Sequence, residues 1–104
     1  MSEIVTVSIA CASEDEAQAL ALALVETKLA ACAQTTAIHS TYRWRGAVEQ
    51  AAEVLLTLKT LAAKLPELEA LVKARHSYDT PEIVATPVVW ASADYAAWLR
   101  ESLA

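Results

Sequence analysis

Glycine is almost missing from this sequence, and asparagine and phenylalanine are missing altogether. The single glycine, Gly46, cannot supply the several glycines with which P-loop and dinucleotide-binding motifs wrap phosphate groups. The aromatic residues are not arranged at strand spacing beside basic residues, as they are on sheets that bind single-stranded RNA. These absences exclude nucleotide binding through the glycine-rich motifs and argue against RNA recognition.

Positive charge is also scarce. Eight Lys and Arg residues stand against 13 Asp and Glu residues, which gives a formal net charge of -5 and no basic surface for a phosphate backbone. The N-terminus lacks the basic and apolar stretches of a signal peptide, and no apolar run is long enough to span a bilayer. We therefore expect a cytoplasmic protein with neither nucleic acid nor membrane among its partners.

Apolar residues, in contrast, are abundant. They make up 56% of the 104 residues, which suffices for the core of one domain over residues 1–104. Alternation of apolar and polar residues predicts strands, and apolar residues three and four apart predict helices. Ser13 and Glu16 form a capping box that predicts the start of the first helix. The predicted strands cover residues 4–11, 32–44, about 48–59 and 83–90, and the predicted helices cover 14 to about 30, 65–75 and a short segment after Ser92 and Asp94.

The order of these elements predicts an α+β, ferredoxin-like fold: βαββαβ followed by a C-terminal helix. Right-handed crossovers give an antiparallel sheet of strand order 4-1-3-2 with the helices on one face. The fourth strand is then at an edge, where Pro87 is tolerated. This topology brings the end of the first strand and the end of the second helix together, so we expect Cys11 beside His76, with Tyr78 and Glu82 in the same region.

The polar segment 75–82 is the natural place to look for function, because loops carry most binding residues. Cys11 and His76 form a soft ligand pair that suits copper(I) or zinc, and a nearby carboxylate would complete the site. The alternative interpretation is structural: Cys11 is a small core residue, and His76 is a cation at the C-terminal end of a helix.

The second cysteine, Cys32, begins the second predicted strand. That position is about 20 Å from Cys11, far beyond the distance that a disulfide spans. Two reduced cysteines are typical of a reducing compartment.

Several short motifs, taken in order, resemble the CutA family of divalent-cation tolerance proteins. They are LAAC at 29–32, YRWRG at 42–46, EV at 53–54 before LKT at 58–60, and HSY at 76–78 followed by TPE at 80–82. The resemblance implies a ferredoxin-like subunit, a homotrimer, a cytoplasmic location and binding of copper or other divalent ions. It implies no established enzymatic reaction, so we do not expect an enzyme.

The resemblance also assigns residues. Cys11 matches a cysteine that is associated with copper in some members, and His76 matches the histidine of a His-Pro-Tyr loop. Three features depart from the family pattern. Ser77 stands where proline is usual, Arg75 stands where some members have a second histidine, and the second strand lacks a Pro-Gly turn.

Other residues match polar positions that line a pocket between subunits in the family: Glu53, Lys59, Tyr78 and Glu82. Tyr42 and Trp44 flank the predicted hairpin turn, and we expect them to anchor trimer packing and to line the same pocket between subunits. Surface ion pairing is the plainer interpretation of the charged residues.

Such a pocket also suggests a rival function, that of a trimeric PII-type sensor that binds a small metabolite or anion between subunits. An enzyme with Glu82 and Lys59 as acid and base is a third hypothesis. The topology argues against it, because it places these two residues at opposite ends of the sheet.

Overall fold

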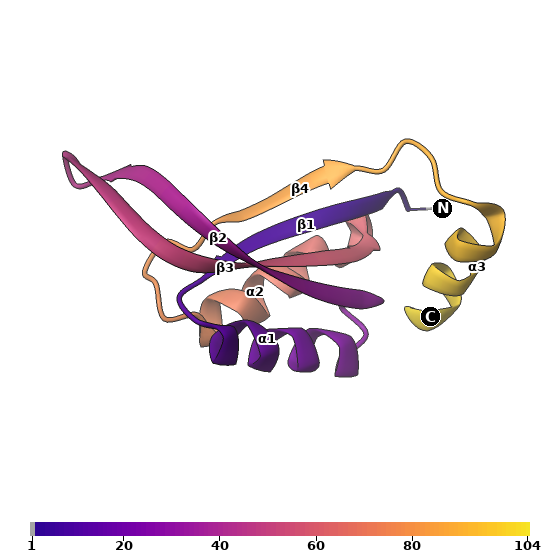
Figure 1. Cartoon of the computed structure of the whole chain (residues 1–104). Helices are drawn as coiled ribbons and strands as arrows, with labels where there is room; N and C mark the ends of the chain where they lie inside the picture. The colour runs from indigo at the N-terminus through magenta and orange to yellow at the C-terminus, as the bar shows by residue number, and fades with distance from the viewer. Residues whose placement is uncertain (1) are drawn as a thin grey trace.

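The computed structural model describes residues 2–104 and consists of a four-stranded sheet with helices against one face (Figure 1). The elements are β1 (Ile4–Cys11), α1 (Glu14–Glu26), β2 (Cys32–Trp44), β3 (Ala47–Leu61), the 3-10 turn η1 (Ala62–Lys64), α2 (Leu65–Arg75), β4 (Ile83–Pro87) and α3 (Ala93–Ser102).

The strand order is β2-β3-β1-β4, and each neighbouring pair is antiparallel. This is the predicted ferredoxin-like order, with β4 at an edge. Helices α1 and α2 lie side by side under the same face of the sheet, whereas α3 lies beyond its end near the N-terminus (Figure 1). The predicted α+β fold is therefore confirmed.

The core lies between the sheet and the two helices. Alternate residues of β1 and β3 point toward α1 and α2, as the period of two requires. The fully buried residues of this core include Val7, Ile9, Leu56, Leu58, Leu20, Leu24, Leu68 and Val72. A smaller cluster of Ile4, Ala31, Leu99 and Leu103 holds α3 against the start of β1.

Helix α1 begins as predicted but ends about four residues earlier. The Ser13 hydroxyl accepts a hydrogen bond from the Glu16 amide at 3.1 Å, which fixes the N-terminus. At the other end, the Thr27 hydroxyl donates to the Ala23 carbonyl, and Lys28 adopts a left-handed φ of 60°. The chain therefore leaves the helical path at Lys28, and Leu29 is buried as part of the following loop instead of the helix.

The β2–β3 hairpin is longer than the body of the sheet, and its tip projects well beyond the helices (Figure 1). Both residues of the turn have positive φ, 50° at Arg45 and 83° at Gly46, which is the geometry that matches the twist of two-residue hairpins. The sequence predicted this conformation for Gly46 alone. Residues 41–50 are all exposed in the single chain.

Strand β4 is shorter than predicted. It ends at Pro87 instead of Trp90, because its partner strand β1 begins at Ile4 and leaves nothing for the chain beyond Val88 to pair with. Val88 still donates to the Ile4 carbonyl at 3.0 Å, but Val89 and Trp90 leave the sheet and are 98% and 79% exposed. Among residues 2–104, no helix has both the length and the apolar character needed to cross a membrane.

Replacing Thr60 by valine tests the packing between β3 and the loop that follows α1. The Thr60 hydroxyl is fully buried and donates to the Leu29 carbonyl at 2.7 Å. Removing this donor leaves a buried carbonyl without its partner, so we expect the free energy of unfolding to fall by about 1–3 kcal/mol. Denaturant unfolding measures the change. Thr86→Val, the same change at an exposed strand position, is the control and should alter stability much less; equal effects would contradict the assignment.

Candidate functional site

The end of β1, the start of α1 and the end of α2 meet at one end of the sheet. They bring together Cys11, Glu16 and His76, whose possible ligand atoms all lie within 4.8 Å of one another. The structure thus places Cys11 beside His76, as the topology predicts. We call these three residues the thiol–imidazole cluster.

His76 caps the C-terminus of α2, and its side chain is fully buried. Its Nδ1 accepts a hydrogen bond from the Tyr78 amide at 3.0 Å, and its Nε2 lies 2.8 Å from the Ala10 carbonyl oxygen. Because an amide can only donate, Nδ1 is unprotonated and the ring hydrogen is on Nε2, which donates to Ala10. This pair of bonds requires a neutral imidazole.

Glu16 is the third member, and the sequence interpretation gave it only a role in helix capping. One carboxylate oxygen accepts from the Ala12 amide at 2.9 Å, one residue before the position that a capping box uses. The other accepts from the Ser77 amide at 2.8 Å. Partial burial works to raise the pKa of Glu16, but the bonds from Ala12 and Ser77 outweigh it and hold the pKa below its usual value.

Cys11 is completely buried. Burial, and then the charges of Glu16 and Glu53, raise the pKa of its thiol to about 12, so the thiol is protonated at neutral pH. The other cysteine, Cys32, lies far along the sheet: it pairs with Lys59 of β3, whereas Cys11 pairs with Val54. Both cysteines are free, as predicted.

The donor types of the thiol–imidazole cluster fit a soft metal ion, since they offer a sulfur, an imidazole nitrogen and a carboxylate. Each donor already has a partner within the protein, however. The thiol holds its proton, and the free lone pair of His76 faces the Tyr78 amide. An ion bound through the His76 Nε2 therefore requires two changes. The Cys11 thiol must lose its proton, and Nε2 must give up its hydrogen bond to the Ala10 carbonyl.

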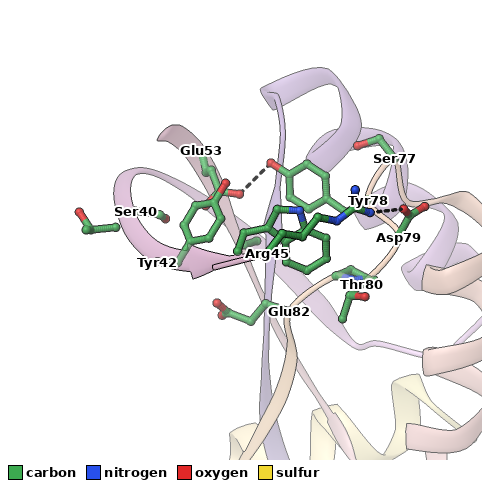
Figure 2. A pocket seen from close by; sticks show the side chains of 13 residues that line it. Ser40, Tyr42, Arg45, Glu53, Ser77, Tyr78, Asp79, Thr80 and Glu82 are labelled. Carbon is green, nitrogen blue, oxygen red and sulfur yellow. Dashed lines mark hydrogen bonds and ion pairs between the residues drawn. The ribbon is translucent and has the colours of Figure 1, made fainter. Parts of the chain in front are cut away.

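A cavity of about 760 Å³ adjoins the cluster, because its lining includes Ala10 and Ser77, the chain neighbours of Cys11 and His76. Figure 2 shows the side chains that line this cavity. Glu53 is 7% exposed there and accepts a 2.8 Å hydrogen bond from the Tyr78 hydroxyl. The Tyr78 ring packs against the His76 ring, with centroids 4.9 Å apart, and so connects the cavity to the cluster. Burial, reinforced by the bond to Glu53, raises the pKa of Tyr78.

Most of the residues predicted for a pocket between subunits line this cavity. They are Tyr42, Trp44, Glu53, Tyr78 and Glu82. Lys59 does not lie with them in the described chain, because its position on β3 is opposite Thr6 and Cys32, and its ammonium group donates to Gln34 at 2.9 Å. The predicted separation of Lys59 and Glu82 within one chain is therefore observed.

The cavity also contains Arg45 and Asp79, to which the sequence interpretation gave no role. The two side chains approach each other at 3.9 Å across the space between the hairpin tip and the loop after α2 (Figure 2). No local pattern links them, since their pairing depends on how far the hairpin extends over that loop.

Comparison with known proteins now defines the family. A family model described as CutA1 divalent ion tolerance protein matches residues 5–102. The chain belongs to this family. The CutA protein of Thermus thermophilus, named a divalent-cation tolerance protein, is 43% identical over 103 residues, which cover 98% of each sequence. Human Protein CutA is 36% identical over 94 residues, or 89% of this chain, which spans about half of the human sequence.

Solved CutA structures agree with the fold. The structure of the CutA protein from Archaeoglobus fulgidus, titled a periplasmic divalent cation tolerance protein, has a TM-score of 0.95 at 36% identity, over 97% of this chain and 99% of that one. The Thermus thermophilus structure has a TM-score of 0.94 at 42% identity, over 97% and 99%. In both comparisons the match extends over nearly the whole of each chain.

Proposed function

We propose that this CutA-family chain is a cytoplasmic, homotrimeric cation-tolerance protein that binds copper or another divalent metal ion at Cys11, Glu16 and His76. The observation that carries the proposal is the convergence of three ligand atoms within 4.8 Å from three separate elements. The names of the relatives, which refer to divalent-cation tolerance, support the same role.

The chemistry of the cluster supports a soft or borderline ion. A thiolate and an imidazole favour copper or zinc over magnesium or calcium, and a carboxylate adds negative charge beside the ion. The thiol binds the metal only after it loses its proton, so the ion and the proton compete for Cys11.

Binding, not catalysis, is the role that we assign. The acid and base candidates considered from the sequence, Glu82 and Lys59, lie apart within one chain. The rival anion sensor is also less well supported, because the described residues of one chain line the cavity with the carboxylates of Glu53, Asp79 and Glu82 and with the guanidinium of Arg45. The two free cysteines support a reducing, cytoplasmic location.

Exposed apolar surface supports the trimer. The helices cover one face of the sheet, and the other face is open in the single chain (Figure 1). Val84 on that open face is 53% exposed, and Val48 on the hairpin is 63% exposed. A subunit with this much uncovered apolar surface gains stability when copies of itself cover it.

Copper titration of variants tests the metal site. We expect Cys11→Ser and His76→Ala to weaken copper(I) binding to the reduced protein by about 100-fold or more, as measured against a competing chelator. Because one thiol proton leaves when the ion binds, the apparent affinity should rise about tenfold for each unit of pH between 6 and 8, well below the thiol pKa of about 12.

Cys32→Ser is the matched control, since it makes the same change at the distant thiol and should leave the affinity unchanged. The proposed site would be refuted if Cys11→Ser and Cys32→Ser changed the affinity equally. It would also be refuted if Cys11→Ser left the affinity unchanged, or if His76→Ala did.

Light scattering tests the assembly. The wild-type chain should have the mass of three 11.2 kDa subunits. Val84→Asp places a charge on the open sheet face and should dissociate the trimer. Leu22→Asp, at a residue of α1 that is 63% exposed, should leave it intact. A wild-type mass of one subunit would reject the trimer.

A further inference from the structure

Tyr78 holds the His76 ring in two ways. Its backbone amide donates to Nδ1 at 3.0 Å, and its own ring packs against the imidazole with centroids 4.9 Å apart. At the far end of the same side chain, the Tyr78 hydroxyl donates to Oε2 of Glu53 at 2.8 Å (Figure 2). Tyr78 therefore connects the imidazole of the thiol–imidazole cluster to a carboxylate on β3.

Glu53 is a firm anchor for this connection. It is buried on β3, where it lies opposite Ile38 of β2. The next residue, Val54, lies opposite Cys11 of β1, so Glu53 and Cys11 are held by the same paired strands. All of these contacts are made within one chain, and so they do not depend on the residues that a neighbouring subunit adds to the cavity.

The ring nitrogen of His76 that faces the rest of the cluster is Nε2, which lies 3.9 Å from a carboxylate oxygen of Glu16. In the metal-free protein Nε2 carries the ring hydrogen and donates to the Ala10 carbonyl, so it has no lone pair for an ion. A neutral imidazole offers the Nε2 lone pair only when the hydrogen is on Nδ1. Two donors, Nδ1 and the Tyr78 amide, would then face each other, so the amide has to move away.

We propose that Glu53 is a positioning residue that limits metal binding at the thiol–imidazole cluster. Its bond to the Tyr78 hydroxyl keeps the Tyr78 amide against Nδ1, which keeps the ring hydrogen on Nε2. Breaking that bond lets the amide withdraw and makes the other tautomer, with Nε2 free to bind, more accessible. This role rests on the proposed function, because it concerns the metal affinity of the same cluster.

Tyr78→Phe tests this role, because it removes the hydroxyl and leaves the ring and the amide in place. Copper(I) titration of the reduced full chain against a competing chelator should show binding about three- to tenfold tighter than wild type. The gain is smaller than the whole contribution of a hydrogen bond to a carboxylate, because the Ser77 amide still holds the loop to Glu16. Tyr95→Phe is the matched control: it removes a hydroxyl that lies 3.4 Å from the Cys32 sulfur, away from the cluster, and should bind copper like wild type.

Substitutions of Glu53 separate the effect of the bond from general damage to the cavity. Glu53→Gln keeps an oxygen that can accept from Tyr78, so its copper affinity should stay within about twofold of wild type. Glu53→Ala removes the acceptor and should tighten binding as Tyr78→Phe does. Combining Glu53→Ala with Tyr78→Phe should give no further gain, because both changes break the same bond. Unchanged or weaker binding in Tyr78→Phe, or gains that add in the double variant, would overturn the role of Glu53.

Nitrogen NMR of the His76 ring in the metal-free protein separates this role from the metal site itself. The wild-type ring should carry its proton on Nε2 alone, whereas Tyr78→Phe should show a measurable share of rings with the proton on Nδ1. An unchanged tautomer in Tyr78→Phe would contradict the role of Glu53, even if copper binds at the cluster. Copper affinity left unchanged by Cys11→Ser or by His76→Ala would instead refute the proposed metal site.

Discussion

The carboxylate of Glu16 joins parts of the chain that are far apart in sequence, and the candidate site depends on this junction. One oxygen accepts from Ala12, directly after β1, and the other accepts from Ser77, directly after α2. The His76 ring forms a second bridge between the same segments, from the Ala10 carbonyl to the Tyr78 amide. Together these bonds fix the loop after α2 against the end of β1.

The position of this loop determines the surroundings of both candidate binding regions. Once Ser77 and Tyr78 are held, the Tyr78 hydroxyl reaches the buried carboxylate of Glu53 on β3, and its ring covers His76. Asp79 then lies within reach of Arg45 at the hairpin tip. The cluster and the cavity are thus two sides of one hydrogen-bonded loop.

The same bonds that build the cluster also occupy its ligand atoms. His76 uses both ring nitrogens to hold the loop, and the buried Cys11 thiol keeps its proton. An ion bound as we propose would compete with a proton and with these backbone hydrogen bonds, so the proposed affinity would depend on pH and on the order of the loop.

Local patterns in the sequence were sufficient for the presence of each strand, the Ser13 cap and the strand order. They did not predict the end of β4, which stops at Pro87 instead of Trp90. The convergence of Cys11 and His76 followed from that topology. The early end of α1 was not predicted. It depends on Lys28, which adopts a left-handed φ of 60° where a glycine would be the usual signal. The second bond of Glu16 and the place of Arg45 depend on contacts between distant segments, which no local pattern encodes.

Nitrogen NMR of the His76 ring in the metal-free, reduced protein tests the junction most directly. The chain has two histidines, so a His39→Gln variant assigns the signals. The hydrogen bonds described here require a neutral ring with the proton on Nε2 and an unprotonated Nδ1 that accepts from Tyr78. A ring protonated on Nδ1, or one that exchanges between both tautomers as a free imidazole does, would contradict them.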